Sequence, residues 1–491
     1  MASWLLRNGR VVDPSQGLDG PHDILIVNGR IAELRPVGAR VSDAPGSKGR
    51  GVARAARGAA KPVPAGAHVV DLAGRIVTPG LVDMHVHLRE PGQEHKEIIE
   101  TGTRAAAAGG FTSVACMPNT DPVNDSLSVT EYIVAEARRR GAVNVYPIGA
   151  VSKGSAGEEL AEIGDMVRAG AVAVSDDGRP VSSSHLMRMA LEYTRLFDIP
   201  VINHCEDRSL SAGGVMNEGT ASTLLGLKGI PAASESIMVA RDLRLLELTG
   251  GRLHLAHLST RASLDEVRRA RAKGAKVTCE ATPHHLVLTE EEVVRSRYDS
   301  ATKMNPPLRA EEDRLALLHA LEDGTVDVIA TDHAPHHADE KLVEFDDAPF
   351  GIVGLETAVA LVMDRLVRPG HIDLSRMVEL MALNPARILG LKKGTLAVGA
   401  DADLTVIDPE TTRAVEPDRF ESRSRNTPFT GWKLRGWPVM TFVGGRLAHD
   451  ARDAAGRAPH AAREMQPRAG KSAARRETRT RAGKNPRPGA R

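Results

Sequence analysis

Six histidine and aspartate residues of this 491-residue chain stand at the ends of apolar runs or directly after them. The first two form His85-Val86-His87, and side chains two apart in a strand point the same way, so both imidazoles can bind one ion. The rest of the set follows or closes later runs: Asp177, His204, His257 and Asp332. Imidazoles and carboxylates together suit zinc or a similar divalent metal. The pattern predicts a metal-dependent hydrolase.

The elements that must position these residues are short apolar segments that alternate with helix-compatible ones such as Glu97–Ala108 and Ser234–Leu248. Eight strand-like runs are found: Leu81–His87, Thr112–Met117, Asn144–Val151, Ala171–Asp176, Pro200–Cys205, Arg252–Leu258, Lys276–Ala281 and Val326–Thr331. Eight strand–helix repeats over roughly 250 residues predict an α/β fold, the closed (β/α)8 TIM-type barrel. An open doubly wound sheet is the alternative, but no glycine fingerprint follows the first run.

Such a barrel would bring the candidate ligands together. His85 and His87 end the first strand, His204 the fifth and His257 the sixth, while Asp177 and Asp332 follow the fourth and eighth. All six positions are at the C-terminal ends of strands, the face where barrel enzymes carry their active sites. We therefore expect the six side chains to converge at one mouth.

Both ends of the chain have β character outside the barrel, which we place at residues 80–391. Strand-like runs such as Trp4–Val12 lie within residues 1–79, and Gly394–Val398, Leu404–Ile407 and Val439–Leu447 lie within residues 392–449. These segments predict a small β-sandwich domain built from both chain ends. Residues 37–67 have almost no large apolar side chains and are expected to be a disordered insertion, and 450–491 a disordered basic tail.

Charge and cysteine content narrow the class of protein. The net charge of +1 predicts no attraction to nucleic acid or membrane, although residues 452–491 carry twelve Arg/Lys and three Asp/Glu, hence +9. This tail could recruit an acidic partner, but a solvated tail is expected. No apolar stretch reaches the roughly 20 residues of a membrane span, and three cysteines cannot form a disulfide framework. We expect a cytoplasmic protein.

A second metal ion would need a bridging ligand. No lysine occurs between Lys153 and Lys228, so a carboxylated lysine at the end of strand four is excluded. Asp177, or its neighbour Asp176, is the bridging candidate at that strand, although Asp176-Asp177-Gly178 is also a typical turn. Whether the site binds one ion or two is left open.

Several segments carry a resemblance to a known family. Gly80-Leu81-Val82-Asp83-Met84-His85-Val86-His87-Leu88-Arg89-Glu90-Pro91-Gly92 resembles the opening signature of dihydroorotases within the amidohydrolase superfamily. Met117–Thr120, Asn203–Glu206, Lys303–Pro307 and Ala330–His336 resemble its later motifs. In having Asp177 where other members have the bridging lysine, the chain resembles the bacterial type I branch of dihydroorotases.

The resemblance implies a role for each matching residue. One or two zinc ions would be held by His85, His87, Asp177, His204, His257 and Asp332. Arg89, Asn119 and His336 would bind the substrate carboxylate, and Asn305 with the Phe350-Gly351 backbone the pyrimidine ring. A metal-bound hydroxide would open the ring of dihydroorotate, with Asp332 as general base and then acid, or reversibly close N-carbamoyl-L-aspartate in pyrimidine biosynthesis.

Two other readings stay open. A hydantoinase-like cyclic amidase would act on rings that lack a carboxylate, leaving Arg89 without a purpose. A non-catalytic scaffold partner of aspartate transcarbamoylase is the other, but degenerate members of that kind lose metal ligands and this chain keeps all six. An active enzyme could also associate with aspartate transcarbamoylase or form a homo-oligomer.

Overall fold

A computed structural model describes residues 2–37 and 62–451 of the chain. Its centre is a parallel sheet of eight strands whose spatial order follows their order in the sequence. The strands are β6 (Leu81–Val86), β7 (Phe111–Cys116), β8 (Asn144–Gly149), β9 (Ala173–Val174), β10 (Val201–Asn203), β13 (Leu253–Leu255), β14 (Val277–Ala281) and β15 (Val328–Ile329). Each lies within one residue of, or inside, a predicted run.

The sheet curls so far that its first and last strands almost meet. An isolated parallel bridge joins Val86 to His333, just beyond β15, and the His87 amide donates to the His333 carbonyl over 2.9 Å. His333 also bridges to Ile352. The predicted (β/α)8 barrel is confirmed, with closure made by the residues that follow β15.

Packing explains why the barrel strands read as unbroken apolar runs. Every residue of β6 and β7 is buried, because one face contacts the barrel interior and the other the surrounding helices. Side chains from successive strands, among them Met84, Ala115 and Ile148, form one apolar cluster. The helices between strands are α1 (Ile99–Ala108), α2 (Leu127–Arg140), α3 (Ile163–Ala169), α4 (Ser184–Thr194), α7 (Ala233–Thr249), α8 (Arg261–Ala272) and α11 (Glu311–Glu322).

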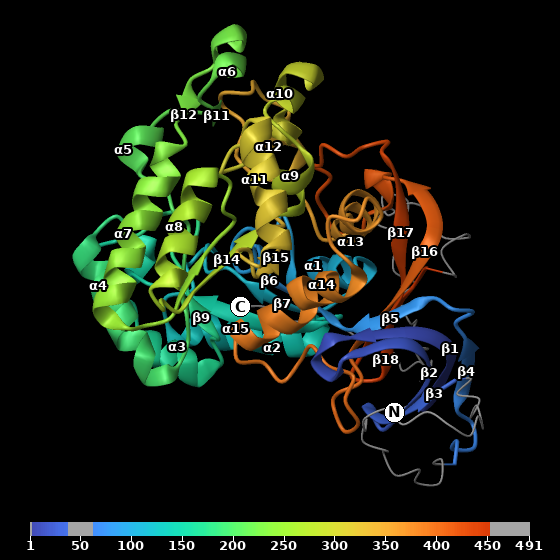
Figure 1. The fold of residues 1–491 in the computed structure, drawn as a ribbon. Helices are drawn as coiled ribbons and strands as arrows, with labels where there is room; N and C mark the ends of the chain where they lie inside the picture. Colours follow the sequence, from blue (N-terminus) through green and yellow to red (C-terminus); the bar gives the residue numbers. More distant parts are fainter. Residues whose placement is uncertain (1, 38–61, 452–491) are drawn as a thin grey trace, which may run out of the picture.

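One connection carries a small extra unit, seen at the top of Figure 1. Between β10 and α7 the chain forms α5 (Arg208–Ser211), β11 (Met216–Asn217), α6 (Thr220–Leu225) and β12 (Gly229–Ile230). Val215 and Met216 of this unit pack against Val293 and Phe345. The remaining helices are α9 (Pro283–Val287), α10 (Glu291–Ser296), α12 (Ala338–Lys341), α13 (Ala358–Val362), α14 (Leu374–Val378) and α15 (Asn384–Ile388).

The two chain ends share a second sheet, shown on the right of Figure 1. Its order is β18-β17-β16-β5-β1-β2-β3, with β4 paired to β1, and β5 joins the two halves. The strands are β1 (Trp4–Asp13), β2 (Leu18–Val27), β3 (Arg30–Pro36), β4 (His68–Asp71), β5 (Ile76–Pro79), β16 (Leu404–Ala414), β17 (Lys433–Val443) and β18 (Arg446–Asp450). Both ends of the chain contribute strands to this sheet, as predicted.

Some expectations fail in detail or lie beyond the described residues. Residues 394–398, expected to form a strand, have no regular structure. The run at 439–447 is interrupted by a turn at Gly444-Gly445, which separates β17 from β18. Most of the predicted insertion and tail, residues 38–61 and 452–491, lie outside the described part of the chain. The domain boundaries themselves stay predictions.

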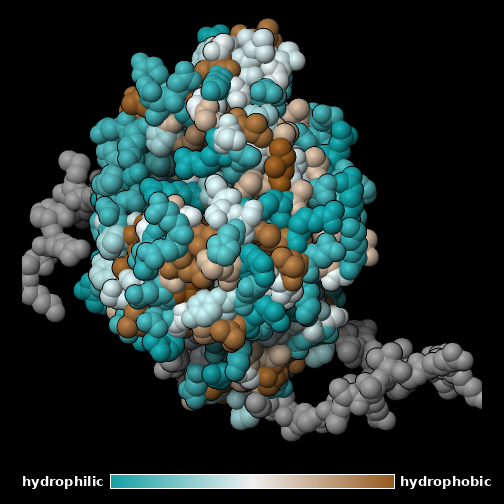
Figure 2. Space-filling model, turned by 90° about the vertical axis from the view of Figure 1, so that its left-hand side faces the viewer, coloured by the Kyte–Doolittle hydropathy of each residue, from teal (hydrophilic) through white to brown (hydrophobic). Residues whose placement is uncertain are grey.

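The surface over α4 and α7 faces the viewer in Figure 2 and is largely hydrophilic, with the apolar colour divided among several patches. Exposed apolar side chains on these helices include Tyr193, Ile237 and Leu248.

Among the described residues, no helix combines the length and apolar character needed to cross a bilayer.

Candidate active site

Two overlapping groups of buried side chains form the centre of the barrel mouth. One contains His85, Asp177 and His257, and the other His85, His87 and Asp332; within each, the candidate ligand atoms lie within 4.8 Å of one another. His87 Nε2 is 3.0 Å from Asp332 Oδ1, and His85 Nε2 is 3.5 Å from the same oxygen. Residues almost 250 positions apart are thus brought into one cluster by barrel closure.

His204 lies at the edge of the first group. Its Nδ1 atom is 3.0 Å from His257 Nε2 and 3.8 Å from Asp177 Oδ1. Asp177 occupies the middle, because its Oδ1 is also 3.4 Å from His85 Nε2 while its Oδ2 is 3.6 Å from His87 Nε2. The structure therefore places the four candidate imidazoles around the Asp177 carboxylate, with Asp332 beside two of them.

The choice between the two neighbouring aspartates is made by their hydrogen bonds. Asp176 accepts the backbone amides of Val151 and Ser152 over 2.8 and 3.1 Å, and the Ser152 hydroxyl as well. Its two carboxylate oxygens are thus taken up by the segment that follows β8. Asp177 is therefore the strand-four residue that could bind metal.

The donor set of this cluster fits a divalent metal. His85 Nε2 and Asp177 Oδ1 are buried, and neither has a hydrogen-bond partner among the described residues. Unsatisfied buried polar atoms are costly, so their convergence needs an explanation. A cation between the imidazole nitrogens and carboxylates would satisfy them, and both ligand types suit such an ion.

The charges of the cluster point the same way. Burial alone would raise the pKa of Asp177, but the imidazoles of His85, His257 and His87 outweigh it and hold that pKa well below its usual range. For Asp332, burial is likewise outweighed by His85 and His87, which lower its pKa. Burial would lower the pKa of His85, yet Asp177 and Glu280 raise it well above the ordinary value. Both aspartates are therefore anionic at neutral pH.

Glu280 is a functional candidate that the sequence reading missed. It lies on β14, fully buried; its Oε1 is 2.6 Å from His85 Nδ1 and its Oε2 is 3.1 Å from His254 Nε2. A carboxylate accepts hydrogen bonds, so the Nδ1–H of His85 donates to it, and Nε2 is the nitrogen that faces Asp177 and Asp332 and would bind a metal ion in place of a proton. The available signal was a glutamate inside an apolar strand-like run.

Asn119 has a similar relation to His87. Its Oδ1 lies 2.8 Å from His87 Nδ1 and accepts from it, so Nε2 is the His87 nitrogen that faces Asp332. The sequence reading assigned Asn119 to the substrate carboxylate. Because Oδ1 is engaged, only its amide NH2 group is available for that role, which stays a prediction.

Arg89 is buried at the same mouth. Its Nε donates to the Pro335 carbonyl over 3.2 Å, and burial lowers its pKa to about 10, although Asp332 opposes that shift. The group is still cationic at neutral pH. Arg89, His257 and Asp332 have φ angles of 62°, 29° and 47°, a region that non-glycine residues rarely adopt and that is concentrated at functional sites.

The other predicted substrate residues have internal partners. His336 Nε2 is 2.8 Å from the Phe350 carbonyl, and burial together with Arg89 lowers its pKa to about 3. Gly351 donates its N–H to the Lys303 carbonyl over 2.9 Å, and its own carbonyl accepts from Asn426. Three of the backbone groups expected to hold the ring, the Phe350 carbonyl and both groups of Gly351, thus already have partners. Their role, like that of His336, stays a prediction.

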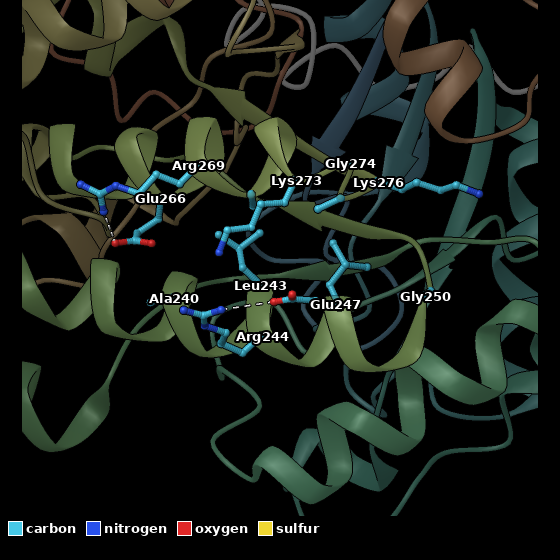
Figure 3. Close-up of a pocket in the computed structure, with 14 residues that line it drawn as sticks. Ala240, Leu243, Arg244, Glu247, Gly250, Glu266, Arg269, Lys273, Gly274 and Lys276 are labelled. Carbon is cyan, nitrogen blue, oxygen red and sulfur yellow. Dashed lines mark hydrogen bonds and ion pairs between the residues drawn. The ribbon is translucent and has the colours of Figure 1, made fainter.

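A separate pocket of about 350 Å³ lies far from these residues along the barrel axis. Figure 3 shows that α7 contributes Leu243 and Glu247 to its lining and that α8 contributes Glu266 and Arg269, with Gly250 where α7 ends. Its lining includes Gly251 and Lys276, which precede β13 and β14, so the pocket opens at the N-terminal ends of the strands. Its lining contains none of the candidate ligands, which lie at the C-terminal ends of the strands, where barrel enzymes carry their active sites.

Comparison with known proteins places this geometry in a family. The family described as dihydro-orotase-like matches residues 74–263. The dihydroorotase of Pelotomaculum thermopropionicum is 55% identical over 443 residues, which cover 90% of this chain and 97% of the relative. That of Geobacter sulfurreducens is 56% identical over 445 residues, 91% of this chain and 99% of the relative. The chain belongs to the dihydroorotase family.

A solved structure extends the comparison to the fold. The L-hydantoinase (dihydropyrimidinase) from Arthrobacter aurescens superimposes with a TM-score of 0.77 and 26% identity, covering 92% of this chain and 96% of the hydantoinase. The family predicted from the motifs is therefore confirmed, as is the barrel fold. The roles of the individual residues stay proposals.

Proposed function

We propose that this protein is a metal-dependent dihydroorotase that reversibly converts N-carbamoyl-L-aspartate to dihydroorotate, a step of pyrimidine nucleotide biosynthesis. The observation that carries the proposal is the position of Asp332, whose Oδ1 lies 3.0 Å from His87 Nε2 and 3.5 Å from His85 Nε2. An anionic carboxylate is thus held against the ligand cluster in a chain that belongs to this family.

The metal we propose is zinc. When bound, it would lower the pKa of a coordinated water toward about 7 and polarise a carbonyl oxygen. His85, His87 and Asp332 would hold one ion, and His204 and His257 a second. Asp177 supports a two-ion arrangement, because its two oxygens face imidazoles of both groups. One ion bound mainly by His85, His87 and Asp332 is the simpler alternative.

Asp332 would move the proton. Its pKa is held low by His85 and His87, so it is ionised and can accept the proton of the attacking water. The same oxygen would then deliver that proton to the ring nitrogen as the amide bond breaks. In the direction of ring closure, Asp332 would take the proton from the ureido nitrogen.

Arg89 would anchor the substrate. A buried guanidinium with a planar fork of N–H donors suits a carboxylate, and its Nε is already fixed by Pro335. The Asn119 amide NH2 would support the same carboxylate, and Asn305 would face the ring. His336 would join them only by donating its Nε2–H to the substrate in place of the Phe350 carbonyl. A substrate that carries an anionic group makes use of Arg89, whereas hydantoin would not.

Association with other chains is a separate proposal. A homo-oligomer and a complex with aspartate transcarbamoylase both stay predictions, as does a cytoplasmic location.

The test is turnover of dihydroorotate by zinc-loaded protein, with hydantoin and allantoin assayed in parallel. We expect ring opening of dihydroorotate alone, lost on chelation and restored by zinc. Activity confined to the neutral rings would contradict the proposal in favour of a hydantoinase-like amidase. Absence of activity on all three, with zinc bound, would point to the scaffold role.

A further inference from the structure

Glu206 contacts two candidate site residues with one oxygen. Its Oε2 lies 3.3 Å from His204 Nε2 and 3.2 Å from Asn305 Nδ2. His204 is a candidate metal ligand, whereas Asn305, about one hundred residues later in the chain, is a candidate for binding the substrate ring. No role has so far been assigned to the carboxylate between them.

The direction of each hydrogen bond follows from the chemistry of the three groups. A glutamate carboxylate at neutral pH can only accept hydrogen bonds. His204 Nε2 must therefore carry the hydrogen, and Asn305 must turn its NH2 group toward Glu206. The Nε2 and Nδ2 atoms are also 3.3 Å apart, but since both are donors to Glu206, they do not bond to each other.

The consequence for His204 is the choice of tautomer. With the hydrogen on Nε2, the lone pair is on Nδ1. That atom is the one that lies 3.0 Å from His257 Nε2 and 3.8 Å from Asp177 Oδ1, at the candidate metal centre. A carboxylate that accepts from the outer nitrogen of a ligating histidine both orients the ring and makes it a better ligand.

The consequence for Asn305 is the orientation of its amide. Because Nδ2 donates to Glu206, Oδ1 must point away from Glu206 and can accept a hydrogen bond. A cyclic amide presents N–H groups along its ring, so an acceptor at this position suits it. The opposite orientation would offer an N–H donor to another N–H donor.

We propose that Glu206 is a positioning residue that couples the metal centre to recognition of the ring, by setting the tautomer of His204 and the amide orientation of Asn305 together. The ring-binding half rests on the proposed function, whereas the metal half does not. Replacement of Glu206 should therefore weaken both zinc binding and binding of the ring. Only the effect on ring binding should depend on Asn305.

The experiment is a double-mutant cycle with two readouts. Glu206→Gln, Asn305→Ala and the double variant are compared with wild type for zinc affinity by chelator competition on metal-free protein, and for KM and kcat with dihydroorotate. Glutamine keeps one acceptor oxygen but loses the negative charge that strengthens both hydrogen bonds, and it adds an NH2 group that cannot accept from either donor. We expect Glu206→Gln to lower zinc affinity roughly 10- to 100-fold and to raise KM, whereas Asn305→Ala should raise KM and leave zinc affinity unchanged.

Coupling is the decisive result. If Glu206 acts on the ring through Asn305, the double variant will have the KM of Asn305→Ala and the zinc affinity of Glu206→Gln. The proposal would be overturned if the increase in KM of the double variant equalled the product of the two single increases. It would also be overturned if Glu206→Gln left zinc affinity unchanged. Glu206→Ala, which can accept neither bond, repeats the test with a larger expected loss.

The matched control is Asp207→Asn. Asp207 is the next residue and caps α5 by accepting the Ser209 amide over 2.9 Å, so it reports on disturbance of the same loop. It should leave both readouts unchanged. Failure of wild type to turn over dihydroorotate would contradict the proposed function, yet it would leave the zinc readout of Glu206 valid.

Discussion

His85 Nδ1 lies 2.6 Å from Glu280 Oε1, and both side chains are fully buried. The two residues belong to β6 and β14, and Glu280 also accepts from His254 and from the backbone amide of His257 over 3.2 Å. One carboxylate thus ties the ends of the first and sixth barrel strands to the seventh. It also sets which nitrogen of His85 faces the other candidate ligands.

Glu280→Gln should therefore weaken metal binding. A glutamine side chain cannot accept from both imidazoles, so His85 would lose its fixed tautomer and the negative charge behind it. We expect zinc affinity to fall roughly 10- to 100-fold, measured by chelator competition without reference to turnover. Glu290→Gln is the control, because Glu290 is also buried but bonds Asn217; equal losses in both variants would argue against a specific role for Glu280.

Asp332→Asn removes the group that we propose moves the proton. The amide is nearly isosteric but cannot take a proton at neutral pH, so kcat should fall by about 10² to 10⁴. Zinc content and thermal unfolding should be measured on the same preparation, to show that metal and fold are retained. A variant that holds zinc and turns over at near wild-type rate would exclude Asp332 as the general base.

Arg89→Met tests the anchor for the substrate carboxylate. Methionine keeps much of the apolar stem and removes the charge, so KM for dihydroorotate should rise roughly 10- to 100-fold with a smaller change in kcat. Arg423→Met, at an exposed arginine that donates to the Glu94 carbonyl, should behave as wild type. An unchanged KM in Arg89→Met would place the carboxylate elsewhere.

Lys341 gives a pH-dependent prediction about stability. Burial, together with the neighbouring Lys303, lowers its pKa from 10.5 to about 7, and its Nζ donates to the Pro349 carbonyl. Below pH 7 the amine is charged in both the folded and unfolded states, so the folded protein bears the full cost of burying the charge. Between pH 7 and 10.5 only the unfolded state stays charged, and this cost declines as pH rises.

The measurement is Tm against pH for Lys341→Met and wild type. The difference in Tm, variant minus wild type, should be most positive at pH 6 to 7 and should decrease toward pH 10. The exposed Lys273→Met should show no such trend. A difference in Tm that is constant over this range would mean that Lys341 keeps an ordinary pKa.

Much of the barrel could be read from the sequence, because its strands are buried on both faces and stand out as apolar runs. The sequence does not show where each strand ends: β9 and β15 are two residues long, whereas both predicted runs contain six. A polar residue ends the apolar pattern, but only inter-strand hydrogen bonds decide where pairing stops. The prediction of a strand at 394–398 was wrong for the same reason, because an apolar run forms a strand only when another strand pairs with it.

The sequence by itself determined which residues stand at the C-terminal strand ends, and hence that His85, His87, Asp177, His204, His257 and Asp332 would be candidates for one site. Tertiary structure alone decided that Asp177 rather than Asp176 faces the imidazoles, and that Glu280 and Glu206 stand behind His85 and His204. Strand position follows from local apolar patterning, which is written in consecutive residues. The partner of a side chain depends on the register and curvature of strands far apart in sequence, and these are settled only when the barrel closes.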